Sequence, residues 1–76
     1  MRQQRLPEAR EAFENVTRFN PDDYEAEGSL GIIFLRQREL DQAETHFRAA
    51  LRINPDDKLD SNYLGRVLAA KANLKK

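Results

Sequence analysis

Apolar residues recur along much of the chain at steps of three and four, which is the spacing of one face of an α-helix. Together with the helix-end signals, these stripes predict helices at about residues 7–19, 22–37, 40–53 and 57–72. The stripes consist of Leu6, Ala9, Phe13, Val16 and Phe19; of Leu40, Ala43, Phe47, Ala50 and Ile53; and of Leu64, Val67, Leu68 and Leu74. No stretch alternates between apolar and polar for long enough to predict a strand, so we expect an all-α protein.

The tetrapeptide Asn-Pro-Asp-Asp occurs at 20–23 and again at 54–57, and it marks where one helix ends and the next begins. The residue before a proline is pushed out of the α region, so Pro21 and Pro55 should end the preceding helices. The aspartates that follow can accept hydrogen bonds from the free amides of the next first turn. Pro7 suits a first turn, where its missing N–H has no cost.

The sequence repeats with a period of thirty-four residues. Residues 2–23 align with residues 36–57, and ten of the twenty-two pairs are identical. In the same register Leu30-Gly31 aligns with Leu64-Gly65. The shared residues are apolar, small, proline or helix-capping types, which indicates a repeated structural unit of two helices.

The central unit, residues 24–57, carries these residues in order: Leu30-Gly31, Phe34, Ala43, Phe47, Ala50 and Pro55. It resembles the tetratricopeptide repeat family, whose pattern is Trp-x-x-Leu-Gly-x-x-Tyr, then Ala-x-x-x-Phe, then Pro. Phe34 stands in the Tyr position. Two further positions depart from the family's usual residues: Glu27 replaces the Trp, and Arg38 stands in a turn where the family often has glycine.

The resemblance implies a right-handed α-solenoid of antiparallel helix pairs, with four helices in a single domain. One half repeat would occupy residues 1–23, a full repeat 24–57 and a second half repeat 58–76. The small residues at Gly31, Ala43 and Ala50 should let paired helices approach closely. The outer faces of the first and last helices should be partly uncovered. We therefore expect either a piece of a longer array or a module that completes itself by self-association.

In this family the first helix of each pair lines a concave surface, and the resemblance implies that a protein or peptide partner binds there. Helical spacing maps that surface onto nine residues of this chain: Glu25, Gly28, Ile32, Leu35, Arg36, Leu59, Asn62, Arg66 and Ala69. The segment 30–35 is apolar on all sides of the helix. Neighbouring helices can cover most of it, which leaves Ile32 and Leu35. These two either pack under the curve of the array or form an apolar strip for a partner peptide or a second copy.

Thirteen basic and thirteen acidic residues cancel, which argues against binding to nucleic acid or to an anionic membrane. No apolar run approaches the roughly 20 residues that span a bilayer, and we expect no signal peptide because the first residues lead into no hydrophobic stretch. The chain has no cysteine, which is compatible with a reducing compartment. We expect a cytoplasmic protein without membrane insertion.

Little in the sequence suggests catalysis. His46, the only histidine, is expected on the surface and has no partner at a spacing typical of a triad or a metal site. The acidic clusters at 22–27 and 56–60 lack the calcium-loop pattern and are better explained by helix capping. We predict no enzyme activity, cofactor, metal or small-molecule substrate. The predicted function is a non-catalytic protein–protein interaction scaffold; the alternative is a structural homo-oligomerisation module that pairs through exposed repeat faces.

Overall fold

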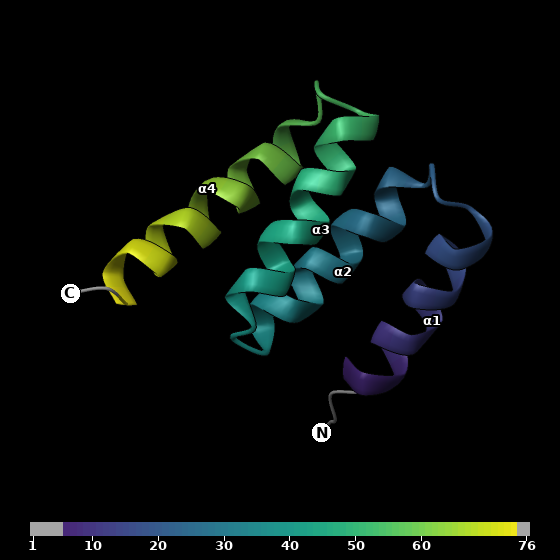
Figure 1. Cartoon of the computed structure of the whole chain (residues 1–76), viewed down its shortest axis with the longest axis horizontal. Helices are drawn as coiled ribbons and strands as arrows, with labels where there is room; N and C mark the ends of the chain where they lie inside the picture. Colours follow the sequence, from purple (N-terminus) through teal and green to yellow (C-terminus); the bar gives the residue numbers. More distant parts are fainter. Residues whose placement is uncertain (1–5, 75–76) are drawn as a thin grey trace.

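The computed structural model describes residues 6–74, and these residues form four α-helices (Figure 1). The helices are α1 (Leu6–Phe19), α2 (Tyr24–Arg36), α3 (Leu40–Ile53) and α4 (Lys58–Leu74). Every boundary lies within two residues of the predicted one. No strand occurs in this part of the chain, so the predicted all-α class is confirmed.

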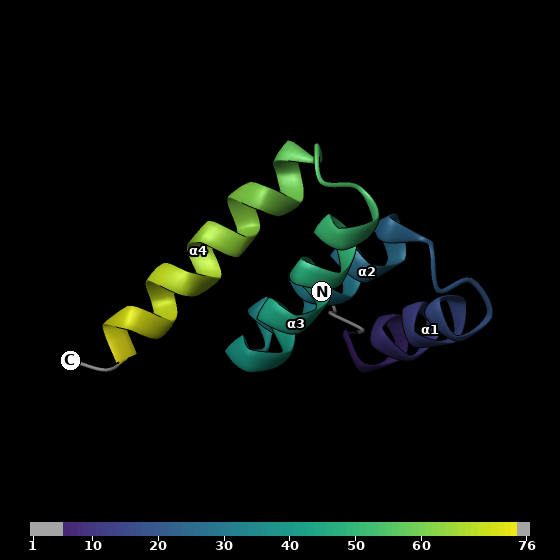
Figure 2. The same ribbon diagram turned by 45° about the horizontal axis from the view of Figure 1, so that its top comes forward.

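The helices follow one another as antiparallel neighbours. α2 and α3 pack against each other at the centre, α1 packs against α2, and α4 packs against α3. Figure 2 shows the same order from a second direction, with α1 and α4 at opposite ends of the array. Helices in contact mainly with their chain neighbours form a layer that extends in one direction, as in a solenoid.

The helix starts repeat with the predicted period. Asp23 Oδ1 accepts a hydrogen bond from the Ala26 N–H at 3.1 Å, and Asp57 Oδ1 accepts one from the Asp60 N–H at 3.1 Å. Each bond satisfies a first-turn amide that has no partner within the helix. The predicted capping role of these aspartates is therefore confirmed for α2 and α4.

The turn between α2 and α3 explains why glycine suits this position in a repeat. Arg38 has a φ of 62°, in the left-handed region. The Glu39 N–H donates to the Phe34 carbonyl at 2.8 Å, and the Arg38 N–H donates to the Leu35 carbonyl at 3.0 Å. These two bonds form a Schellman motif, in which the residue with positive φ is usually glycine. Arg38 adopts the conformation at a steric cost that glycine avoids.

The core lies where α2, α3 and α4 meet. Its side chains are almost fully inaccessible: Leu30, Phe34, Leu40, Ala43, Phe47 and Val67. The Phe47 ring lies against the backbone of Gly31, where a Cβ atom would come within 2.7 Å of the ring. Ala43 and Ala50 have no exposed surface. The predicted role of these small residues in close helix packing is therefore confirmed.

Part of the predicted apolar stripe of α4 is not buried. Leu68 is 40% exposed and Leu74 is 71% exposed, because no helix in the described chain packs on that side of α4. Phe19, at the end of α1, is 79% exposed. The prediction that the outer helices are partly uncovered is confirmed, whereas the burial implied for Leu68 and Leu74 was wrong.

Polar contacts between helices were not anticipated. His46 was expected on the surface, but it is half-buried: its ring stacks on Phe34 with centroids 5.3 Å apart, and its Nδ1 lies 2.7 Å from Glu27 Oε1. Lys71 of α4 pairs with Asp41 and Glu44 of α3, with both N–O distances at 2.7 Å. These contacts hold α2 against α3 and α3 against α4, so the residues that make them have a structural role.

Candidate functional site

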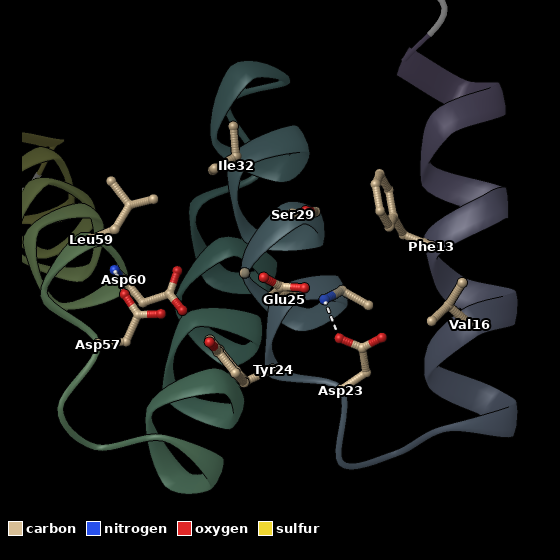
Figure 3. A pocket seen from close by; sticks show the side chains of 12 residues that line it. Phe13, Val16, Asp23, Tyr24, Glu25, Ser29, Ile32, Asp57, Leu59 and Asp60 are labelled. Atoms are coloured by element: carbon tan, nitrogen blue, oxygen red, sulfur yellow. Dashed lines mark hydrogen bonds between the residues drawn. The ribbon is translucent and has the colours of Figure 1, made fainter.

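An open pocket of about 500 Å³ lies between α1, α2 and the first turn of α4 (Figure 3). Phe13 and Val16 line it from α1, and Leu59 and Asp60 line it from α4. The other lining residues belong to α2 and to the two capping turns: Asp23, Tyr24, Glu25, Ala26, Gly28, Ser29, Ile32 and Asp57. Ligand-binding pockets typically measure about 300–1,000 Å³, so this one is large enough for one or two side chains of a partner.

The repeat places equivalent residues around the same pocket. Glu25 and Ala26 of α2 correspond to Leu59 and Asp60 of α4, thirty-four residues further on. The first turn of each helix therefore faces the pocket in two successive repeat units. The two turns differ in chemistry at both positions, because Leu59 replaces the acid Glu25 and Asp60 replaces the apolar Ala26.

Part of the pocket wall is apolar. Phe13 points from α1 toward α2, and Val16 lies one turn further along α1 (Figure 3). Ile32 is half-buried because it also packs against the core. Leu59 is 60% exposed, which leaves its side chain free for contact.

The polar part of the pocket is acidic. Asp23, Glu25, Asp57 and Asp60 all contribute carboxylates, and no lysine, arginine or histidine is among the described residues that line it. Asp23 and Asp57 use one oxygen each for helix capping. The net charge of the whole chain is zero, so the negative charge gathered at the pocket is balanced by basic residues elsewhere in the chain.

Asp60 is the most unusual of these residues because it is only 4% exposed. Its carboxylate extends from α4 toward α2 (Figure 3) and lies over Gly28, where a Cβ atom would come within 2.6 Å of Oδ1. Burial, and secondarily the negative charge of Asp57, raises the pKa of Asp60 from its ordinary 3.8 to about 6. Ala26 and Asp60 are therefore buried to a similar extent, but only Asp60 carries the unfavourable desolvation of a charged group.

Four of the nine residues predicted to bind a partner line this pocket: Glu25, Gly28, Ile32 and Leu59. Gly28 is buried beneath the Asp60 carboxylate, so it contributes space rather than a side chain. The other five residues lie outside the pocket: Leu35, Arg36, Asn62, Arg66 and Ala69. Leu35 packs partly against the core, and the Arg66 guanidinium lies over the Tyr63 ring at 5.4 Å.

Sequence reasoning missed Asp60, together with Phe13 and Val16 from α1. The signal for Asp60 was present, because the thirty-four-residue register pairs it with Ala26, a small apolar residue. Phe13 and Val16 were assigned only to the apolar stripe of the first helix. Both are half-buried and face the pocket as well as α2.

Other kinds of site have no counterpart in residues 6–74. No three His, Cys, Asp or Glu side chains converge there in a way that could hold a metal ion. The helices of this region are too polar or too short to cross a membrane.

The fold is that of a helical repeat protein: antiparallel helix pairs recur every thirty-four residues, with small residues at the contacts and a pocket over the first turns. The sequence model of the tetratricopeptide repeat family matches residues 1–58. The chain therefore belongs to the tetratricopeptide repeat family. Members of this family generally serve as protein-interaction modules and are typically non-catalytic. Comparisons with curated proteins and with solved structures gave no match.

Proposed function

We propose that this chain is a non-catalytic scaffold that binds a peptide segment of a partner protein on the concave face of the array. The contact would centre on the pocket between α1, α2 and α4. Family membership supports protein binding in general. The position of the contact rests on one observation, which is that the first turns of two successive repeat units line a single pocket.

The chemistry of the pocket favours a peptide over a small metabolite. Its wall combines apolar side chains from α1, α2 and α4 with carboxylates from the first turns of α2 and α4, and the pocket is open to solvent. A peptide can place an apolar side chain and a polar side chain on these two parts while its backbone passes outside. Two half-buried anchors, Phe13 and Ile32, offer the packing that interface hot spots usually need.

The test begins with a selection of short random peptides on the immobilised 76-residue chain, followed by affinity measurements on the enriched peptides. Two leucines of α4 give a matched pair of variants. Leu59 is 60% exposed and lines the pocket, whereas Leu68 is 40% exposed and lies outside it. Neither belongs to the core, so serine at either position should leave the helical content unchanged.

We expect Leu59→Ser to weaken peptide binding by roughly tenfold, equivalent to about 1.4 kcal/mol, and Leu68→Ser to leave it unchanged. If no peptide is enriched, the proposed function is wrong. Equal losses in both variants would place the contact elsewhere on the chain.

A second candidate function is self-association, which is favoured by the exposed apolar residues at both ends of the array. Phe19 is 79% exposed on α1, and Leu74 is 71% exposed on α4. Such residues could pair between copies, in the way that neighbouring repeats cover one another. Light scattering over a range of protein concentrations separates the two functions. If the mass in solution is that of a monomer at all concentrations, self-association is wrong, and the peptide-binding function is unaffected by that result.

A further inference from the structure

Asp60 is a nearly buried residue whose carboxylate has no compensating charge. The residue is 4% exposed, and neither of its side-chain oxygens accepts a hydrogen bond or pairs with a cation among residues 6–74. Its own N–H is bonded to Asp57, so that acidic neighbour adds negative charge rather than compensating it. Buried carboxylates are normally paired or fully hydrogen-bonded, because desolvation of a lone charge is unfavourable.

The fold itself does not need a carboxylate at this position. The repeat-equivalent residue is Ala26, which is 3% exposed and so occupies a site of the same depth. Asp60 lies in the first turn of α4, where the helix dipole favours an acid by about 0.3–1 kcal/mol, a smaller effect than the desolvation penalty that alanine avoids. Stability alone would therefore favour alanine at residue 60, which indicates that the carboxylate serves another purpose.

The neighbouring residues make room for the carboxylate and direct it into the pocket. Gly28 has no side chain, and any Cβ at that position would collide with the Asp60 oxygens. The carboxylate reaches across from α4 to α2 and lines the pocket beside Glu25 (Figure 3). Phe13, Ile32 and Leu59 form the apolar wall near it.

We propose that this pocket binds a lysine or arginine side chain of the partner, with Asp60 as its counter-ion. This inference rests on the proposed function and specifies the partner's chemistry. The aliphatic stem of a basic side chain would pack along the apolar wall, and its charged head would meet the buried carboxylate. Asp57 and Glu25 attract the same charge, so the whole acidic side of the pocket is complementary to a cation.

The experiment uses two small probes, Nα-acetyl-lysine methylamide and Nα-acetyl-norleucine methylamide, which differ in the ammonium group. Each is titrated into the isotope-labelled 76-residue chain at neutral pH, and the amide signals of Ser29 and Asp60 are followed by NMR. The lysine probe should shift both signals in a saturable way, and the norleucine probe should leave them in place. Equal shifts from the two probes, or none from either, would overturn the inference.

Variants test whether Asp60 is the counter-ion. Asp60→Ala restores the residue of the preceding repeat, and Asp60→Asn keeps the shape without the charge. Either change should weaken lysine-probe binding by roughly fivefold or more, because a charge-assisted contact is lost. Asp56→Ala removes an exposed carboxylate of the same turn that does not line the pocket, and it should have no effect. Unchanged binding in both Asp60 variants would overturn the inference.

The outcome is separable from that of the proposed function. If peptides bind in a Leu59-dependent manner but the Asp60 variants bind the lysine probe as tightly as the parent chain does, only this inference is wrong. If binding of the lysine probe depends on Asp60 but the selection enriches no peptide, only the proposed peptide-binding function is wrong.

Discussion

Gly31 and Gly65 occupy equivalent positions one repeat apart, and alanine at these two positions should change stability in opposite directions. Gly31 is buried, and a Cβ there would lie 2.7–2.8 Å from three atoms of the Phe47 ring. Gly65 is exposed on α4, and a Cβ there would meet nothing within 4 Å. The same substitution therefore adds a clash at one site and only a methyl group in open space at the other.

The magnitudes follow from two opposing effects. Alanine is favoured over glycine inside a helix by about 0.8–1.0 kcal/mol, so Gly65→Ala should stabilise the chain by about 0.5–1 kcal/mol. At Gly31 the same gain is opposed by overpacking, which costs about 1–3 kcal/mol. The Phe47 ring has no room to retreat, because it is fully buried and stacks on Tyr63 with centroids 5.4 Å apart. The overpacking cost should therefore lie in the upper part of its range, about 2–3 kcal/mol, so that Gly31→Ala destabilises the chain by about 1–2 kcal/mol after the helix-propensity gain is subtracted.

Thermal and urea denaturation followed by circular dichroism will measure both effects. For a domain of this size about 1 kcal/mol shifts the melting temperature by roughly 4–8 °C, so the two variants should be clearly separated on either side of the parent chain. A stabilising Gly31→Ala would mean that Phe47 does not pack against α2 as described. A destabilising Gly65→Ala would mean that another surface covers α4 at that position.

Three further changes test other parts of the fold. Arg38→Gly should raise the unfolding free energy by about 0.5–1 kcal/mol, measured by urea denaturation, because a φ of 62° costs arginine energy that glycine does not lose. Asp60→Ala should stabilise the chain by about 1–3 kcal/mol near neutral pH. Burial and Asp57 raise the Asp60 pKa to about 6, so the destabilising effect of its charge is fully present above pH 6 and is lost by pH 3.8. The difference in unfolding free energy between Asp60→Ala and the parent chain should disappear over that window. A difference that stays constant with pH would argue against a buried charge. Lys71→Met should lower the melting temperature at low salt and less so at high salt. The Lys71 ion pair lowers the pKa of Glu44, so its contribution is present above pH 4.5 and is lost as the pH falls further; no change at low salt would mean that the pair is not formed in solution.

The regular features of this molecule could be predicted from its sequence because they are set by local rules. The apolar spacing predicted the helices, the Asn-Pro-Asp-Asp turns predicted where α1 and α3 end and where α2 and α4 begin, and the family resemblance predicted the close helix packing at Gly31. Each of these depends on residue types that recur at fixed separations, so two copies of the pattern reinforce each other.

The features that escaped prediction depend on contacts between residues far apart in the chain. His46 was expected on the surface because a single polar residue gives no sign of a partner nineteen positions earlier, Glu27. Leu68 belongs to the apolar stripe of α4, but it would be buried only if a further helix packed on that side of α4. Asp60 was grouped with the capping aspartates beside it; the repeat register pairs it with Ala26, but its burial is visible only in the structure.

The most direct test of the account is where a bound peptide contacts the chain. The measurement is the change in amide NMR signals of the 76-residue chain on addition of a peptide obtained by selection. We predict that the largest changes fall at Gly28, Ser29, Ile32 and Leu59, around the pocket between α1, α2 and α4. Changes concentrated at Thr45, Arg48 and Arg52, on the exposed face of α3, would contradict a binding site in this pocket.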